Sequence, residues 1–203
     1  MKTGNQITGI ILAGGQGSRL GRDKGLIGLN GKSLAEHAMD VLSPFCNKIM
    51  ISSNNPGYHV FPCEIVPDRL PGYGPMMGIS SALKASSTTM NLVLAVDNVF
   101  VTREFFNYLI SRDLSNHQVA VPFVKNNYFE PLVGYYSRTC LPVMEEMMQE
   151  SNYKLPDLFS RVSVEKLMVE TDFPAFHPDY FHSLNHPEDL LLLHTLKDGH
   201  LQP

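Results

Sequence analysis

The N-terminal part of the chain couples a short apolar run to a glycine-rich, basic loop. Residues 7–12 are a strand candidate, and four glycines fall within positions 14–21. Glycine lets successive backbone N–H groups turn toward one point, which suits an anion such as a phosphate. Three basic side chains and one acid give residues 19–24 a charge of +2, in a chain of formal net charge −4. This strand and loop predict an α/β sheet whose first loop receives a pyrophosphate or triphosphate.

Two familiar phosphate loops do not match this segment. The pattern G-x-x-x-x-G-K-[ST] is absent, and the pattern G-x-G-x-x-G would need glycine where Leu20 stands. The sequence therefore predicts neither a P-loop nucleotidase nor a dinucleotide-binding dehydrogenase. An ordinary turn between a strand and a helix is the alternative, but such a turn needs one or two glycines and no cluster of basic side chains.

Short apolar runs alternate with helical patterns over the first 110 residues. Strands are expected at residues 48–52, 64–66 and 92–96, and helices at residues 32–45, 76–85 and 103–111. Such alternation predicts parallel βαβ units. In the remainder, residues 119–122 and 132–136 are strand candidates, and the second can pair antiparallel. Residues 141–150 and 187–196 have helical patterns.

No composition shift or linker divides the chain. We therefore expect one domain over residues 1–203, with a nucleotide-binding half at about 5–110 and an acceptor-binding half at about 111–197. In an open sheet of this kind, ligands bind at the carboxyl ends of the strands.

Composition excludes several classes of protein. Hydrophobic residues make up 43% of the 203 residues, so the chain can form a sizeable core and is not mainly disordered. The negative net charge argues against a nucleic-acid-binding protein, and no apolar run is long enough for a membrane span. The first apolar run is too short for a signal peptide, and the three cysteines form no C-x-x-C pair. These features predict a cytoplasmic protein with reduced thiols.

Four ordered motifs carry a family resemblance. Residues 12–24 read L-A-G-G-Q-G-S-R-L-G-R-D-K, which resembles the signature loop of nucleotidyltransferases of the sugar-nucleotide transferase fold. With the G-K-S-L of residues 31–34, this segment looks most like the molybdenum cofactor guanylyltransferase family. The later matches are Asp68 followed by G-P-M-M-G-I at residues 74–79, then Asp97, and finally S-L-N-H-P-E-D-L at residues 183–190.

The resemblance implies a Rossmann-like three-layer α/β/α nucleotidyltransferase fold. Its sheet would be mostly parallel, with an antiparallel strand in the second half. The implied reaction is a Mg²⁺-dependent transfer of GMP from GTP to molybdopterin or molybdenum cofactor, with release of pyrophosphate. The implied partners are GTP, the pterin acceptor and, transiently, other cofactor-assembly proteins. Phosphoryl-group transfer requires little covalent chemistry from the protein. Catalysis would therefore come mainly from positioning the substrates and neutralising their charge.

The resemblance also implies roles for individual residues. Lys24, Arg19 and Asp97 would be catalytic, with Lys24 on the pyrophosphate side and Asp97 holding Mg²⁺. The implied nucleotide-binding residues are Leu12, Ala13, Gly14, Gly15, Lys24, Ser52, Asp68 and Asp97. Asn185 and Ser183 would line the acceptor side. Glu130, in F-E-P-L, lies in a segment similar to the one that precedes the family's later strand.

The chain departs from the family pattern at several of these positions. Val96 precedes Asp97 where a cysteine is usual, and Asn98-Val99 replaces the usual small residue and proline. Ser52 stands where asparagine is common, although Asn54 follows, and Ser183 replaces the first asparagine of the closing motif.

These departures leave two alternatives open. One is a cytidylyltransferase or sugar-phosphate nucleotidyltransferase of the same fold, because the loop alone does not determine the base. The other is a nucleotide-binding protein that has lost turnover.

Overall fold

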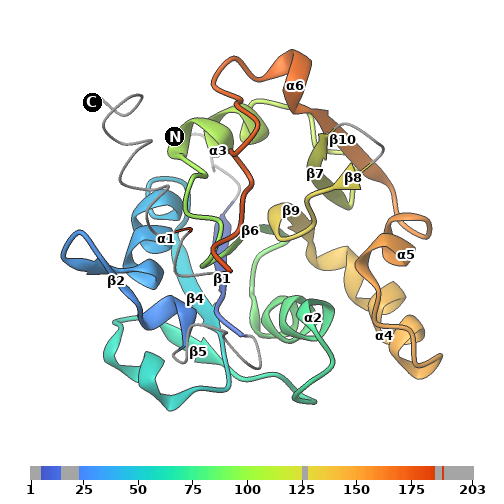
Figure 1. The fold of residues 1–203 in the computed structure, drawn as a ribbon. Helices are drawn as coiled ribbons and strands as arrows, with labels where there is room; N and C mark the ends of the chain where they lie inside the picture. The colour runs from blue at the N-terminus through green and yellow to red at the C-terminus, as the bar shows by residue number, and fades with distance from the viewer. Residues whose placement is uncertain (1–5, 15–22, 125–127, 186–188, 190–203) are drawn as a thin grey trace.

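The computed structural model describes residues 6–14, 23–124, 128–185 and 189. Its centre is a mixed sheet with the strand order β10-β7-β9-β6-β1-β4-β5, and β8 pairs with β7 (Figure 1). The strands of this path are β1 (Ile7–Leu12), β4 (Lys48–Ser52), β5 (Glu64–Val66), β6 (Met90–Ala95), β7 (Val119–Val124), β9 (Val133–Ser137) and β10 (Val164–Met168). Strand β8 is Tyr128–Phe129, and a separate hairpin pairs β2 (Gly28–Leu29) with β3 (Lys32–Ser33).

Most strands of the sheet run in one direction. Strand β1 is parallel to both β4 and β6, β4 is parallel to β5, and β10 is parallel to β7. Strand β9 is antiparallel to β6 and β7, between which it lies. The carboxyl ends of β1, β4, β5, β6, β7 and β10 therefore lie along the same edge of the sheet. The predicted antiparallel strand of the second half is confirmed as β9.

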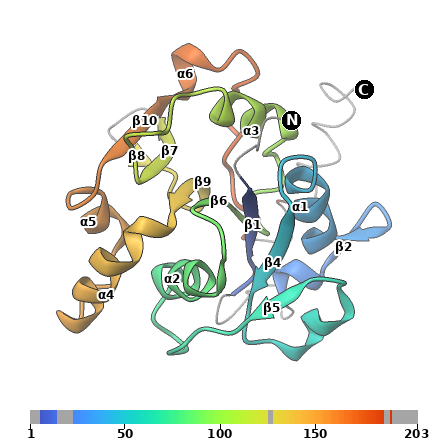
Figure 2. The ribbon, with the colours of Figure 1, turned by 180° about the vertical axis from the view of Figure 1, so that it is seen from behind.

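Helices cover both faces of the sheet, as Figures 1 and 2 show. One apolar cluster joins the sheet to α1 (Leu34–Leu42), α3 (Arg103–Ile110) and α6 (Val169–Asp172). The second cluster joins the opposite face to α2 (Pro75–Ala85), α4 (Leu141–Gln149) and α5 (Leu155–Phe159). Short 3₁₀ turns are η1 (Lys24–Leu26), η2 (Pro56–Val60) and η4 (Arg138–Cys140). The predicted three-layer architecture is confirmed.

Local sequence signals explain where the main helices begin. Ser33 caps α1, because its side chain accepts from the Glu36 N–H while the Glu36 carboxylate accepts from the Ser33 N–H. Helix α2 begins at Pro75, whose fixed φ suits the first helical position. Thr102 is the N-cap residue of α3, but its side chain makes no capping bond. Its hydroxyl instead lies 2.7 Å from the hydroxyl of Tyr180.

The predicted elements of the first 110 residues are all present, with ends that differ by at most three residues from those expected. Three elements were not predicted from the sequence: the β2–β3 hairpin, the short helix α5 and the edge strand β10. The predicted helix at residues 187–196 lies outside the described residues, apart from Asp189. Among the described residues, no helix combines the length and the apolar character that a bilayer span requires.

Candidate active site at the carboxyl edge of the sheet

The ends of three central strands are joined directly by backbone hydrogen bonds. The Ala13 N–H, just after β1, donates to the Ser52 carbonyl of β4 at 3.0 Å. The Val96 N–H, just after β6, donates to the Leu12 carbonyl at 3.1 Å. The residues that follow β1, β4 and β6 therefore share one edge, at which parallel α/β sheets bind ligands.

Lys24 brings two distant segments together at this edge. Its Nζ lies 2.9 Å from Asp97 Oδ2 and 2.8 Å from Asn185 Oδ1. The Lys24 and Asp97 side chains are 23% and 21% exposed, so the ion pair is partly withdrawn from water but remains open to a ligand. All three residues were predicted as site residues, and the structure places them in contact.

The segment 181–185 is fastened to the end of β6 by three hydrogen bonds. The Leu184 N–H donates to the Asp97 carbonyl at 3.0 Å. The buried Asn98 Nδ2 donates to the Phe181 carbonyl at 3.2 Å and to Ser183 Oγ at 3.3 Å. In Figure 1 this late segment crosses in front of the central strands. Asn98 and Ser183, which both depart from the family pattern, are therefore partners of one another.

A second polar group follows β4 and β5. Asn54 and Asp68 bond reciprocally: Asn54 Nδ2 donates to Asp68 Oδ2 at 3.2 Å, and the Asp68 N–H donates to Asn54 Oδ1 at 2.9 Å. Ser52 Oγ lies 3.5 Å from Asp68 Oδ1. Burial raises the pKa of Asp68, and the bonds from Asn54 and Ser52 oppose that rise. The amide that bonds Asp68 in this chain is therefore that of Asn54, two residues after Ser52.

Gly78 of α2 packs closely against this group. A Cβ added at Gly78 would lie 2.9 Å from Ser52 Oγ, 3.4 Å from Asp68 Oδ1 and 3.7 Å from a methyl carbon of Leu12. The predicted nucleotide-side residues Leu12, Ser52 and Asp68 therefore surround one point on α2. Gly78 was not singled out as a site residue, although it lies in the G-P-M-M-G-I motif.

Glu130 is a second carboxylate near Asp97. The Ala95 N–H donates to the Leu132 carbonyl at 3.0 Å, which continues the antiparallel pairing of β6 with β9. Asp97 comes two residues after Ala95, and Glu130 comes two residues before Leu132. Because the two segments run antiparallel, both carboxylates lie on the same side of this hydrogen bond. Burial, and then the negative charge of Asp97, raise the pKa of Glu130 from 4.5 to about 7. From the sequence, Glu130 had been placed only in a segment similar to the one that precedes the family's later strand.

The donor atoms at the edge fit a magnesium ion. Asp97 offers a carboxylate and Asn185 an amide oxygen, which are hard donors of the kind that Mg²⁺ prefers. Among the described residues, no group of three or more His, Cys, Asp or Glu side chains could hold a metal by itself. A site with one carboxylate and few other protein donors suits Mg²⁺, because this ion usually keeps waters and binds substrate phosphates.

The remaining predicted residues are placed as follows. Leu12 and Ala13 are buried at the end of β1. Gly14 is exposed, and a Cβ added there would meet nothing within 4 Å. Gly15 and Arg19 lie outside the described residues.

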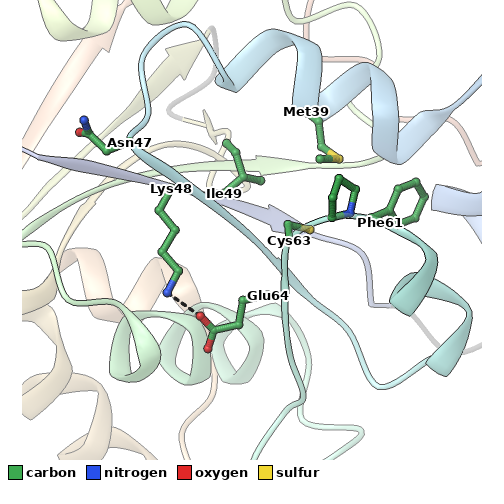
Figure 3. A pocket seen from close by; sticks show the side chains of 8 residues that line it. Met39, Asn47, Lys48, Ile49, Phe61, Cys63 and Glu64 are labelled. Atoms are coloured by element: carbon green, nitrogen blue, oxygen red, sulfur yellow. Dashed lines mark ion pairs between the residues drawn. The ribbon is translucent and has the colours of Figure 1, made fainter.

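A separate hollow of about 690 Å³ lies away from this edge, at the start of β4 and β5 (Figure 3). Its lining includes Met39, Ile49, Phe61 and Cys63. The charged side chains that line it, Lys48 and Glu64, neutralise one another at 2.5 Å. This hollow offers no group suited to phosphate chemistry, so the carboxyl edge is the candidate active site.

Known proteins resemble this chain over most of its length. The sequence profile described as "MobA-like NTP transferase domain" matches residues 9–166. A protein of Flavobacterium johnsoniae named "Probable molybdenum cofactor guanylyltransferase" is 30% identical over 184 residues, which cover 91% of this chain and 96% of that protein. A protein of the same name from Pyrococcus horikoshii is 33% identical over 196 residues, which cover 90% of this chain and 96% of that protein.

Solved structures show the same fold. The crystal structure of molybdopterin-guanine dinucleotide biosynthesis protein A from Archaeoglobus fulgidus matches with a TM-score of 0.76 at 24% identity, covering 94% of this chain and 98% of that one. The 2-C-methyl-D-erythritol 4-phosphate cytidylyltransferase of Thermus thermophilus matches with a TM-score of 0.66 at 13% identity. The match covers 93% of this chain and 98% of that one.

Proposed function

The chain belongs to the MobA-like NTP transferase family, and from this membership we propose that it transfers GMP from GTP to molybdopterin in a Mg²⁺-dependent reaction. A phosphate oxygen of the acceptor attacks the α-phosphorus of GTP. The bond between the α-phosphorus and the bridging oxygen breaks, and pyrophosphate leaves with that oxygen. The product is the guanine dinucleotide form of the cofactor.

The observation that carries this proposal is the contact of Lys24 with Asp97 and Asn185. Three segments from different parts of the chain meet there, at the sheet edge where phosphates bind. In our proposal, the Lys24 ammonium neutralises charge that develops on the leaving pyrophosphate. Asp97 and Asn185 would hold Mg²⁺, and the bound ion would further neutralise the charge of the phosphates.

We assign the nucleoside to the side of the edge formed by β1, β4 and β5. Leu12, Ala13 and Gly14 would lie against the guanine and ribose. Asp68 is a carboxylate acceptor held in place by Asn54 and Ser52. The base edge of guanine offers an N–H and an amino group as donors, so a fixed carboxylate suits guanine.

The other proposed roles come from the family membership. Gly15 and Arg19 would bind phosphates, and Ser183 and Asn185 would line the acceptor side. We also propose that the chain works as one domain, with nucleotide and acceptor halves, in the cytoplasm. Transient delivery of the acceptor by other cofactor-assembly proteins belongs to the same proposal.

Calorimetric titration with GTP, CTP, ATP and UTP, each with and without Mg²⁺, tests this proposal. We expect GTP to bind most tightly, and only with Mg²⁺ and an intact Asp97. A preference for CTP would move the function to a cytidylyltransferase of the same fold. Binding of GTP without acceptor-dependent release of pyrophosphate would indicate a nucleotide-binding protein that has lost turnover.

A further inference from the structure

The turn that carries Lys24 rests on a buried tyrosine. Turn η1 begins immediately after Asp23, whose Oδ1 accepts from the Gly25 N–H at 3.2 Å. The same Oδ1 accepts a short hydrogen bond from the hydroxyl of Tyr58. Asp23 therefore caps the turn from one side and is held from the other by a side chain of η2.

A third donor completes the coordination of Asp23. Asn55 Nδ2 donates to Asp23 Oδ2 at 2.9 Å, so both carboxylate oxygens are bonded. Asn55 is itself fixed, because its Oδ1 accepts from the Gly57 N–H at 2.8 Å and caps η2. Its own N–H donates to Ser53 Oγ at 3.2 Å, just beyond the end of β4. The sheet, η2 and η1 are thereby linked through Asp23.

Close packing adds to these bonds. Tyr58 is fully buried in the apolar cluster beneath α1. A Cβ added at Gly25 would collide with the Tyr58 hydroxyl oxygen and lie 3.0 Å from its ring carbon Cζ. Only glycine lets the turn approach the ring this closely. Burial, followed by the hydrogen bond and charge of Asp23, raises the pKa of Tyr58, so its hydroxyl stays protonated and donates.

We propose that Tyr58, acting through Asp23, is a positioning residue that sets the location of the Lys24 ammonium for phosphate transfer. Lys24 stands between Asp23 and Gly25 in the sequence. The hydrogen bonds of these two neighbours therefore fix the backbone position from which the Lys24 side chain extends. From that start its Nζ reaches both Asp97 and Asn185. Loss of the Tyr58 hydroxyl would leave the ring packing in place and remove one donor from Asp23. The expected effect on catalysis rests on the proposed guanylyl transfer. The effect of Tyr58 on the location of the Lys24 ammonium does not, and it can be tested separately.

The first test needs no substrate. The lysines are labelled by reductive ¹³C-methylation, and the Lys24 signal is identified by its loss in Lys24→Arg. We expect the Lys24 signal of the wild-type protein to differ from those of exposed lysines, because its amine lies between Asp97 and Asn185. In Tyr58→Phe that signal should move toward the exposed lysines. A Lys24 signal unchanged in Tyr58→Phe would overturn the proposal, whatever the protein catalyses.

The control removes a comparable hydroxyl elsewhere. The Tyr108 hydroxyl, on α3, is buried and has no hydrogen-bond partner among the described residues. Tyr108→Phe should leave the Lys24 signal and the turnover number unchanged. A shift of the Lys24 signal in Tyr108→Phe as large as in Tyr58→Phe would mean that the signal reports general destabilisation, and would overturn the assignment to Tyr58.

The second test measures coupling in catalysis. Tyr58→Phe should lower kcat about tenfold or more with a small change in the KM for GTP, since misplacement of a charged group affects the transition state most. In a Lys24→Ala background, the same substitution should change kcat less than about twofold, because its effect passes through Lys24. An equal loss in both backgrounds would show a merely structural role for Tyr58. Failure of the wild-type protein to turn over GTP would instead refute the proposed function and leave the first test standing.

Discussion

The ammonium of Lys24 lies 2.9 Å from the carboxylate of Asp97. The two residues come from the first loop and from the end of β6, and Asn185 joins them from the closing segment. Because the pair is partly buried, its charges are less screened than those of a surface pair. The protein therefore presents a charge arrangement already formed where the proposed triphosphate and metal would bind.

Replacement of Asp97 by alanine should abolish most of the activity. If Asp97 holds the metal, its loss should raise the barrier by roughly 3 kcal/mol or more, which is about 100-fold or worse in kcat/KM. The measurement is steady-state pyrophosphate release by Asp97→Ala and wild type at saturating Mg²⁺. A loss of less than about fivefold would contradict the assignment of Asp97.

Asn98→Ala should reduce both stability and turnover. The substitution removes the bonds from Asn98 to the Phe181 carbonyl and Ser183 Oγ, at a cost of about 1–3 kcal/mol in the free energy of unfolding. Because these bonds fasten the segment that carries Asn185, kcat should fall as well. Urea unfolding and turnover on the same preparation measure the two effects.

Asn91→Ala is the matched control for Asn98→Ala. Asn91 is also fully buried on the β6 segment and donates to the Thr88, Thr89 and Tyr136 carbonyls. It lies near the start of β6, far along the strand from Asp97. Asn91→Ala should lower stability by a similar amount and leave the kcat of the folded protein unchanged. If both variants lose kcat equally, Asn98 has no special link to the site.

Gly78→Ala should weaken nucleotide binding without unfolding the protein. Alanine in a helix interior is ordinarily favoured over glycine by about 1 kcal/mol. Here the new methyl group would lie 2.9 Å from Ser52 Oγ and 3.4 Å from Asp68 Oδ1, so these side chains must move. We expect an unfolding temperature close to that of wild type and an increase of about tenfold or more in the Kd for GTP. Gly28→Ala, where an added Cβ meets nothing within 4 Å, should bind GTP normally.

Glu130 should make the free protein less stable as the pH rises toward neutrality. Its pKa is raised from 4.5 to about 7 by burial and by Asp97, so the folded state binds the proton more tightly than the unfolded state. The resulting stabilisation is complete below about pH 4.5 and is lost as the pH rises through about 7. The free energy of unfolding should therefore change less with pH in Glu130→Gln than in wild type over this interval. The expected difference is roughly 2 kcal/mol after allowance for partial exposure.

Urea unfolding in metal-free buffer between pH 4.5 and pH 8 measures this effect. Glu36→Gln serves as a control, because a backbone hydrogen bond from Ser33 lowers the pKa of Glu36. Its contribution to stability is present above pH 4.5 and is lost only at lower pH. A profile for Glu130→Gln parallel to that of wild type from pH 4.5 to pH 8 would contradict the predicted environment of Glu130.

The central strands β1, β4 and β6 were predictable because apolar residues predominate in each of them. Strands β1, β4 and β5 have the residue limits expected from the sequence. The edge strand β10 was missed, since its sequence V-E-K-L-M contains two adjacent charged residues, Glu165 and Lys166, and so is not an apolar run. The β2–β3 hairpin could have been predicted from the Asn30-Gly31 dipeptide, which is a turn signal. Asn30 and Gly31 both have positive φ, of 51° and 81°, as an Asn-Gly hairpin turn requires.

The sequence predicted the candidate site residues one by one, but it did not predict the contacts between them. The substitutions at positions 98 and 183 looked like independent departures from the family pattern. In the structure Asn98 donates to Ser183 Oγ across 85 residues of sequence, a contact that no local pattern encodes. Likewise, the bond between Asn54 and Asp68 joins residues 14 positions apart in the sequence. Tyr58 gave no sequence signal, because its partner Asp23 lies on another turn and reaches it only through tertiary packing.

The most direct test of the central claim is molybdopterin-dependent release of pyrophosphate from GTP. The assay follows pyrophosphate and the guanine dinucleotide product together, for wild type and for Lys24→Ala, with CTP as the competing nucleotide. We predict equal amounts of the two products from GTP, little product from CTP, and a rate reduced at least about 100-fold in Lys24→Ala. Product formation from CTP in preference to GTP, or unchanged turnover in Lys24→Ala, would contradict the account.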